Sequence, residues 1–370
     1  MEVPFLDLKA QLPQIREEIE ERFSRIIDNT AFVCGREVKE FEETFARLHE
    51  TKYAVGLSSG TDGNHLALLC CEIGQGDEVI LPANTFIATA EGVSHSGATP
   101  VFVDVDEKTF NIDVNKIEER ITSRTKAINP VHLFGQPADL KPIREIAEKY
   151  NILVIEDASQ SHLAEYEEKR VGGISEVTSW SFYPGKNLGA WGEAGAITTN
   201  NEEIYLKARK MRDHGSDRKY YHDLIGFNYR MSEIQAAVLN VKMKYIEEWT
   251  EKRRKNAELY NQLLADIDQV ITPKELDHVK HVYHLYVIRV KNRDELQQYL
   301  KEKGIHTGLH YPIPLHLTQA YAYLGYKRGE FPVAEKLADE ILSLPMYSEL
   351  RSEQIEYVCR KIKDFYNTQF

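Results

Sequence analysis

The spacing of apolar residues changes along the chain and separates it into stretches of different predicted structure. Residues 9–28 and 36–48 carry apolar side chains at intervals of three and four, which predicts two amphipathic helices. Beyond them, short apolar runs alternate with helical stretches as far as residue 155. The predicted strands cover residues 53–57, 78–81, 101–105, 127–131 and 153–155, and helices between most of them cover residues 63–71, 88–96, 114–121 and 140–150.

Strands that alternate with helices predict the α/β class, with a mostly parallel sheet covered by helices on both faces. Residues 232–264 follow a long helical pattern, and strand and helix patterns alternate again after residue 271. We therefore expect a large domain over residues 1–250 and a small C-terminal α/β domain over residues 251–370. Ligand sites in such sheets lie beyond the carboxyl ends of the strands, so polar residues that follow strands are the candidates for chemistry.

Composition narrows the range of functions. The chain has 370 residues and a formal net charge of −12, which opposes non-specific attraction to nucleic acid. No apolar run approaches the length that spans a bilayer, and the first residues lack the apolar core of a signal peptide, so we expect a cytoplasmic protein. The chain has four cysteines, Cys34, Cys70, Cys71 and Cys359, and none shows CxxC spacing. Neither a metal site nor a disulfide framework is therefore expected.

A lysine lies in a turn rich in glycine and proline. The strand-like run 177–182 ends at Pro184 and Gly185, presents Lys186, and returns to a second strand-like run at residues 196–199. Glycine allows a backbone to approach a flat ligand closely, and proline stiffens the turn. The pattern therefore favours a lysine held inside the protein, although an ordinary hairpin with a solvated lysine has the same composition.

The segment after the first predicted strand reads SSGTDGNHLALL. A glycine-rich turn that enters a helix offers free backbone N–H groups and a positive dipole end to a phosphate, and Thr61 adds a hydroxyl. The same residues are also common in an ordinary helix cap. No GKS or GKT follows, so the segment is not a Walker loop.

Two further strand ends carry weaker candidates. Phe86 and Thr85 follow the second strand, where an aromatic ring could stack on a planar ligand or simply pack in the core. His132 follows the fourth strand and could orient a ligand or satisfy a turn.

The strand at residues 152–155 has the sharpest pattern. Four apolar residues predict a buried strand, and Glu156 and Asp157 follow directly, where a carboxylate is poorly solvated. Asp157 could cap the next helix or pair with a protonated heterocycle nitrogen, and Gln160 could reach an oxygen of the same ligand. A phosphate turn, a strand-end aspartate and a loop lysine together indicate a pyridoxal phosphate enzyme.

The sequences of these segments resemble motifs of the DegT/DnrJ/StrS family of nucleotide-sugar aminotransferases. The similar segments are SSGTDG, PANTFIATA, EDASQSH, SFYPGKNLGAWGEAGAITT, GFNYRMSEIQAA and HYPIPLHLTQ, which span residues 58–319. The resemblance implies the fold-type I architecture, with a mostly parallel seven-stranded sheet between helices. One departure is GEAGA: many relatives have an aspartate and two glycines in this segment, so Glu193 and Ala194 are mild variants.

The resemblance also implies a role for each matching residue. Lys186 would bond the cofactor covalently and then move protons, Asp157 would keep the pyridine nitrogen protonated, and Gln160 would bond the ring oxygen. Phe86 would stack on the ring. The phosphate would be held by Gly60, Thr61, Asp62 through its backbone, Ser181, and Asn228 from a neighbouring subunit, so a homodimer is expected. Sugar or pyrophosphate contacts are expected from Tyr183, Arg230, His310, Tyr311 and His316.

The implied reaction is transamination of a nucleotide-linked keto-deoxysugar, with glutamate as the expected amino donor. The segment YPGKNLGA is more similar to family members that act at carbon 3 than to those that act at carbon 4, which favours a dTDP-3-keto-6-deoxyhexose as substrate. A 4-keto sugar or a UDP-linked sugar stays open. Two further functions compete with transamination: a pyridoxal phosphate-dependent dehydration, which family members with histidine at the lysine position perform, and a non-catalytic regulator with the same fold. No metal, nucleic acid or membrane partner is expected.

Overall fold

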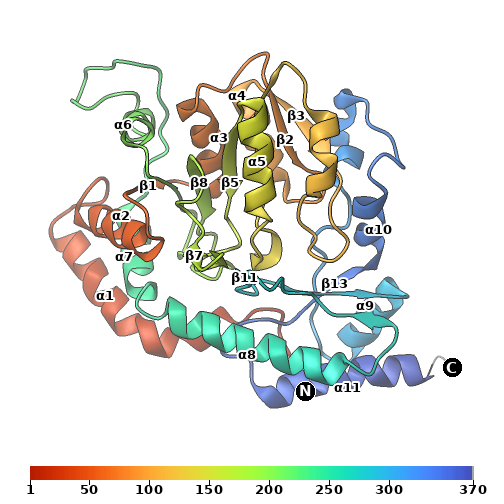
Figure 1. Cartoon of the computed structure of the whole chain (residues 1–370). Helices are drawn as coiled ribbons and strands as arrows, with labels where there is room; N and C mark the ends of the chain where they lie inside the picture. The colour runs from red at the N-terminus through yellow and green to blue at the C-terminus, as the bar shows by residue number, and fades with distance from the viewer. Residues whose placement is uncertain (369–370) are drawn as a thin grey trace.

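The computed structural model describes residues 1–368 and confirms the α/β class (Figure 1). A seven-stranded sheet with the order β1-β9-β8-β5-β4-β2-β3 forms its centre. Only β9 runs antiparallel to its neighbours in this sheet, so the sheet is mostly parallel, as predicted. The strands are β1 (Tyr53–Leu57), β2 (Glu78–Pro82), β3 (Thr99–Val103), β4 (Thr125–Ile128), β5 (Leu153–Asp157), β8 (Val177–Ser181) and β9 (Gly195–Thr199).

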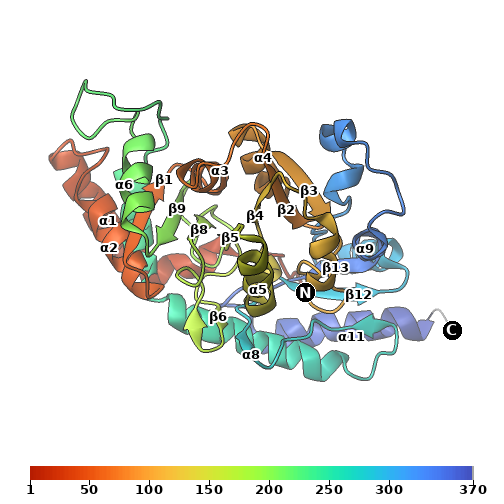
Figure 2. The same cartoon turned by 45° about the horizontal axis from the view of Figure 1, so that its top comes forward.

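Helices cover both faces of this sheet, and Figure 2 shows α3 and α4 on the opposite side from α5. Side chains alternate along each strand, so Val55 and Ile197 pack with α3 and α6, whereas Ala54 and Ala196 pack with α2 and α7. The helices of this part are α1 (Leu12–Asp28), α2 (Arg36–Leu48), α3 (Gly60–Cys70), α4 (Ile87–Ser96), α5 (Leu140–Tyr150), α6 (Glu202–Met211) and α7 (Glu233–Lys242).

The C-terminal part has its own antiparallel sheet of order β10-β12-β13, one hydrophobic core made mainly of its own residues, and a second core shared with β2 and β3. In Figure 1, α8 and α11 run along the lower edge of the molecule. The predicted domain boundary near residue 250 lies inside α8, which runs from one part to the other. The division into two domains at that residue stays a prediction. The elements are α8 (Ile246–Leu264), β10 (Val270–Ile271), β12 (Tyr286–Val290), α9 (Arg293–Glu302), α10 (Pro332–Glu340), β13 (Ile341–Leu344) and α11 (Ser352–Thr368).

Short elements complete the chain and correct two expectations. The helix expected at residues 114–121 is two short 3-10 turns, and the long helix expected at residues 232–264 is interrupted between α7 and α8. Buried apolar residues lie on both sides of that interruption. The spacing of apolar residues therefore continues across it, and the sequence pattern does not reveal where α7 ends. The short elements are β6 (Glu165–Tyr166), β7 (Lys169–Arg170), β11 (Val279–Lys280), η1 (Leu8–Gln11), η2 (Val114–Lys116), η3 (Glu118–Arg120), η4 (Leu133–Gly135), η5 (Leu315–Leu317) and η6 (Gln319–Leu324).

The N-terminal segment crosses to the C-terminal part. Val3 forms a parallel bridge with Ile305, and its N–H donates to the Gly304 carbonyl at 2.8 Å. Phe5 and Leu6 are thereby brought to the region between the two sheets. Within residues 1–368, no helix is both long enough and apolar enough to cross a membrane.

Candidate active site

A cavity of about 670 Å³ lies at the carboxyl ends of the central strands, where the strand pattern predicts the ligand site. It is lined both by residues that follow β1, β2, β5 and β8 and by residues of the C-terminal part. Most of the predicted site residues line it: Gly60, Thr61, Phe86, Asp157, Gln160, Ser181, Tyr183, Lys186, His310 and Tyr311. Asp62, Asn228, Arg230 and His316 do not.

Lys186 lies in the turn between β8 and β9 and is partly buried in the cavity wall. Its backbone N–H donates to the Tyr183 carbonyl at 2.8 Å. Burial lowers the pKa of the Lys186 amine to about 8, and the negative charge of Asp157 offsets part of that effect. A larger fraction of the amine is then neutral and nucleophilic near pH 7 than for a solvated lysine. Lys186 therefore does not resemble the solvated lysine of an ordinary hairpin.

Asp157 ends β5 and is 4% exposed. One carboxylate oxygen accepts hydrogen bonds from Asn64 Nδ2 at 3.0 Å and from Thr89 Oγ1 at 2.7 Å. The other accepts from the Ser159 backbone N–H at 3.1 Å. Three donors therefore fix the position of a carboxylate that lines the same cavity as Lys186.

Sequence reasoning missed Asn64 and Thr89, although a signal for both exists. Each is a polar residue on the buried face of a helix, one turn or less beyond a candidate residue, in the segments GTDGN and FIAT. A buried polar side chain in such a position needs a partner, and Asp157 is that partner.

Gln160 links the cavity wall to the C-terminal part. Its side-chain oxygen accepts from the Phe134 N–H at 2.7 Å, and its amide nitrogen donates to the Tyr311 hydroxyl at 3.1 Å. The ring of Tyr311 lies 5.7 Å from the ring of Phe86. Phe86 is 53% exposed, so its ring is not packed in the core and presents an open face at the cavity.

The start of α3 offers unused hydrogen-bond donors. Among the described residues, neither the backbone N–H groups of Gly60 and Thr61 nor the Thr61 hydroxyl donate a hydrogen bond, and the Ser181 hydroxyl donates none. The Asp62 N–H differs, because it donates to the side chain of the cap residue Ser59 at 3.1 Å. Free donors at the positive end of a helix form an anion site.

Two histidines lie at the same cavity. His310 stacks on Phe5 at 5.7 Å, and its Nδ1 lies 2.8 Å from Ser343 Oγ. Burial, followed by the charge of Lys186, lowers the pKa of His310 to about 4. His284 was not predicted from the sequence. Its pKa is lowered well below the ordinary value, mainly by burial. Both rings are therefore neutral near pH 7 and can donate or accept hydrogen bonds.

The remaining predicted residues lie elsewhere in this chain. Asn228 is exposed on the loop between α6 and α7, and Arg230 Nη1 lies 2.5 Å from Asp213 Oδ1. His316 is buried and bonded to Glu335 at 3.0 Å. His132 is buried against Glu156 at 2.7 Å and accepts from the Ala138 N–H, which fits the interpretation as a turn residue.

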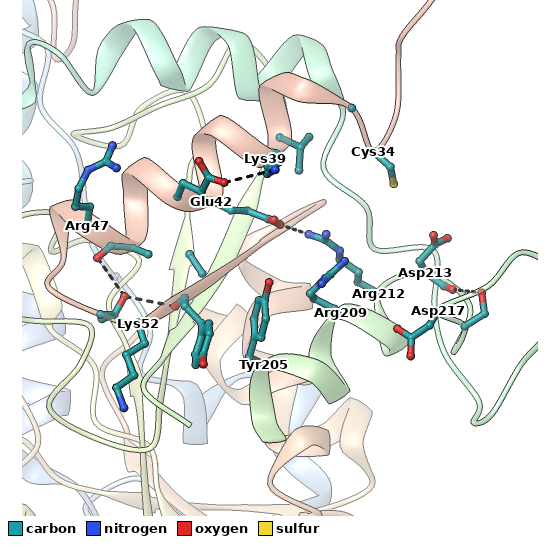
Figure 3. Close-up of a pocket in the computed structure, with 18 residues that line it drawn as sticks. Cys34, Lys39, Glu42, Arg47, Lys52, Tyr205, Arg209, Arg212, Asp213 and Asp217 are labelled. Carbon is teal, nitrogen blue, oxygen red and sulfur yellow. Dashed lines mark hydrogen bonds and ion pairs between the residues drawn. The ribbon is translucent and has the colours of Figure 1, made fainter. Parts of the chain in front are cut away.

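A second groove of about 640 Å³ lies between α2, β1 and α6 (Figure 3). It contains none of the predicted site residues. Some of its charges are paired, since Glu42 pairs with Arg212 and Lys39 with Glu43. Among the described residues, three further cations of its lining form no ion pair: Arg47, Lys52 and Arg209. Within the described chain, no group of three or more histidine, cysteine, aspartate or glutamate residues could hold a metal ion. The reactive groups are therefore concentrated in the first cavity.

Residues 13–363 match the model of the DegT/DnrJ/EryC1/StrS aminotransferase family, and the chain belongs to this family. It is 48% identical to a "Pleiotropic regulatory protein" of Geobacillus stearothermophilus over 99% of both chains. It is 41% identical to a "dTDP-3-amino-3,4,6-trideoxy-alpha-D-glucose transaminase" of Streptomyces venezuelae, over 98% of this chain and 96% of the relative. The solved structure of DesV from S. venezuelae is 41% identical, covers 98% of each chain and has a TM-score of 0.97.

These relationships establish the fold-type I architecture and pyridoxal phosphate as the cofactor of the family. The residues around the cavity fit this cofactor. Its phosphate matches the unused donors at the start of α3, its flat ring matches the open face of Phe86, and its aldehyde needs an amine such as Lys186. Close relatives are aminotransferases of sugars linked to dTDP or UDP.

Proposed function

We propose that this protein is a transaminase that moves an amino group from an amino acid, L-glutamate, to the keto group of a nucleotide-linked deoxysugar. The observation that carries the proposal is a lysine with a lowered pKa, Lys186, in the same cavity as the fixed carboxylate of Asp157. Perturbed amines next to a placed acid are typical of sites where an amine is both nucleophile and proton carrier.

Each residue has a distinct task in this proposal. When bound, pyridoxal phosphate supplies an electron sink for charge that develops on the reacting carbon. Asp157 would hold a positive charge on the ring nitrogen in place, and Gln160 would donate toward the ring oxygen with the amide hydrogen that Tyr311 does not use. The Lys186 amine, once free, carries a proton between two carbon atoms. Gly60, Thr61 and Ser181 bind the phosphate, and the role of the Asp62 backbone stays a prediction because Ser59 already uses its N–H.

The substrate is a dTDP-3-keto-6-deoxyhexose in this proposal. The names of relatives that make 3-amino sugars and the wording YPGKNLGA both support carbon 3. Tyr183 is 55% exposed at the cavity, which His310 and Tyr311 also line, and these three side chains would contact the sugar. Because some relatives act on UDP sugars, the nucleotide is the first part of the substrate to test.

The active unit is a homodimer in this proposal. Asn228 is exposed and lies outside the cavity of its own chain, so it is free to reach the cavity of a second chain. Arg230 lies two residues further along the same segment and would accompany it toward the pyrophosphate.

A non-catalytic regulator is the competing function, because one relative carries the name of a regulatory protein. Such a protein would not need an amine with a lowered pKa beside a fixed carboxylate. The test is to incubate the purified protein with glutamate and a panel of dTDP- and UDP-linked 3-keto and 4-keto sugars. An aminated sugar detected by mass supports the proposal, and its position identifies the carbon. A protein that binds pyridoxal phosphate but aminates no sugar would refute it.

A further inference from the structure

Two buried cations lie behind the cavity wall without lining the cavity. Arg253 of α8 and Lys242 of α7 are each 3% exposed. Removing a cation from water costs several kcal/mol unless hydrogen bonds or an opposite charge compensate it. Their partners therefore indicate what the cations do for the structure.

Arg253 holds two segments that meet at the cavity. Its Nη1 donates to the carbonyl of Tyr283 at 3.2 Å, of His284 at 3.3 Å and of Met346 at 3.0 Å. His284 and Met346 both line the cavity. One side chain thus ties the segment before β12 to the segment after β13.

Lys242 holds the turn that carries the reactive lysine. Its Nζ donates to the carbonyl of Gly189 at 2.7 Å, three residues after Lys186. Gly189 itself is tightly placed, because an added Cβ would stand 2.3 Å from the Pro184 carbonyl oxygen. Fixing Gly189 therefore fixes the path of the turn on both sides of Lys186.

Asn187 joins the two held segments. Its amide nitrogen donates to the Val282 carbonyl at 3.1 Å, and its oxygen lies 3.3 Å from His284 Nδ1. The Lys186 turn is therefore bonded to the 282–284 segment, and each of the two is held from behind by one buried cation.

Neither cation forms an ion pair within 4 Å among the described residues, and the hydrogen bonds of both go to backbone carbonyls. Burial lowers the pKa of Lys242 to about 8 and of Arg253 to about 10, with a partial offset from the charge of Glu349 in both cases. The charge of Glu349 thus compensates part of the burial of both cations without a direct contact, whereas their direct contacts all go to carbonyl groups.

We propose that Arg253 and Lys242 are positioning residues for Lys186, and that they act by fixing the turn and the 282–284 segment which form its wall of the cavity. The inference rests on the assignment of Lys186 as the cofactor lysine in the proposed function, but not on the identity of the sugar. It assigns a role in the reaction to residues that never touch substrate.

The test measures the pKa of the Lys186 amine in cofactor-free protein, by labelling with acetic anhydride across pH and quantifying the modified peptide by mass. Arg253→Met, Lys242→Met, Arg253→Lys and Lys242→Gln are compared with wild type. If the wall loosens and more water reaches Lys186, the pKa of its amine rises by about one unit toward the ordinary value in both methionine variants, and by less in Arg253→Lys, which retains a donor. Pyridoxal phosphate affinity, measured separately, falls with it.

Arg289→Met is the matched control, since Arg289 is also a buried arginine but pairs with Glu107 and Glu340 away from the cavity. It lowers thermal stability and leaves the pKa of Lys186 unchanged. An unchanged pKa in Arg253→Met and Lys242→Met overturns the proposal. So does a shift in Lys242→Gln as large as in Lys242→Met, because glutamine retains a donor but not the charge, and the effect is then one of charge rather than position.

If the methionine variants do not fold, the test uses Arg253→Lys and Lys242→Gln instead. Both retain a hydrogen-bond donor, and the pKa of the Lys186 amine is measured in them in the same way. The result also separates this inference from the proposed function. Wild-type protein that binds no pyridoxal phosphate refutes the function, whereas normal wild-type binding with unshifted variants refutes only the positioning role.

Discussion

Gly60 lies against Ser181 so closely that an added Cβ on Gly60 would stand 2.5 Å from the Cβ of Ser181. The contact joins the start of α3 to the end of β8, the two elements that supply the predicted phosphate donors. Gly195 at the start of β9 lies even closer to its neighbour, since an added Cβ would stand 2.1 Å from the Ser59 carbonyl oxygen. The geometry of the anion site thus depends on the absence of side chains at two positions.

Replacing Gly60 by alanine is expected to separate α3 from β8. Overpacking of this kind costs about 1–3 kcal/mol of stability. Because the donors of Thr61 and Ser181 then no longer converge, the affinity for pyridoxal phosphate is expected to fall at least about tenfold, measured by equilibrium dialysis.

Gly76→Ala is the control for this variant. Gly76 has a φ of +95° and no heavy atom within 4 Å of its Cβ position, so alanine there strains the backbone without touching the site. It lowers the melting temperature and leaves cofactor affinity unchanged. Normal cofactor affinity in Gly60→Ala would show that the start of α3 does not bind the phosphate.

Asp157→Asn keeps the shape of the side chain and removes its charge. Asparagine also presents an amide group to Asn64, Thr89 and the Ser159 N–H, which all donate to the carboxylate. We expect a folded protein whose transamination rate falls by at least about a hundredfold, because preorganised charge at a reacting ring is lost.

The matched variant for that experiment is Asp104→Asn. Asp104 is 2% exposed and accepts from the N–H groups of Val333 and Ala334, so it is a buried carboxylate with a structural role. Its replacement is expected to lower stability but not the rate per folded molecule. Equal losses of rate in both variants would mean that Asp157 acts only through the fold.

Much of this site could be predicted because its residues follow strands directly. Gly60, Phe86, Asp157 and Ser181 come at a strand end or within a few residues after one, and parallel strands bring their carboxyl ends to one edge. The local pattern of apolar residues locates each strand to within a few positions, so the edge follows from short-range information.

The rest depends on contacts between distant segments. His284, Met346 and Phe5 reach the cavity from the C-terminal part and from the N-terminal segment, and no spacing in the sequence relates them to Lys186. His316 stands in a segment similar to the family but is buried against Glu335, which the pattern alone does not reveal. The antiparallel direction of β9 is also a long-range property, because it depends on pairing with β1.

Lys186 is expected to destabilise the cofactor-free protein below pH 8. Its pKa in the folded protein is about 8, lower than its ordinary value of 10.5, so the unfolded chain binds the proton more tightly and folding is penalised. The penalty, on the order of 3 kcal/mol, is complete below pH 8 and disappears as pH rises from 8 to 10.5.

Lys186→Met removes this penalty along with the reaction. The variant without cofactor is therefore expected to melt a few degrees above cofactor-free wild type at pH 7, and the difference should shrink at pH 10, as measured by scanning calorimetry. Lys39→Met, at a lysine whose side chain is 78% exposed, should show no such difference. A variant at position 186 that is less stable at pH 7 would contradict the buried state of the amine.

The proposed contribution of Asn228 from a second chain can be tested by mixing two inactive variants. Lys186→Ala lacks the reactive amine, and Asn228→Asp places a negative charge where the phosphate is expected to bind. If each cavity uses Lys186 of one chain and Asn228 of the other, a mixed dimer has one site with both defects and one site with neither. Unfolding and refolding the variants together should then restore about a quarter of the wild-type sites. If both residues served the same cavity of one chain, every site would keep a defect and the mixture would stay inactive, whatever the oligomeric state measured by sedimentation.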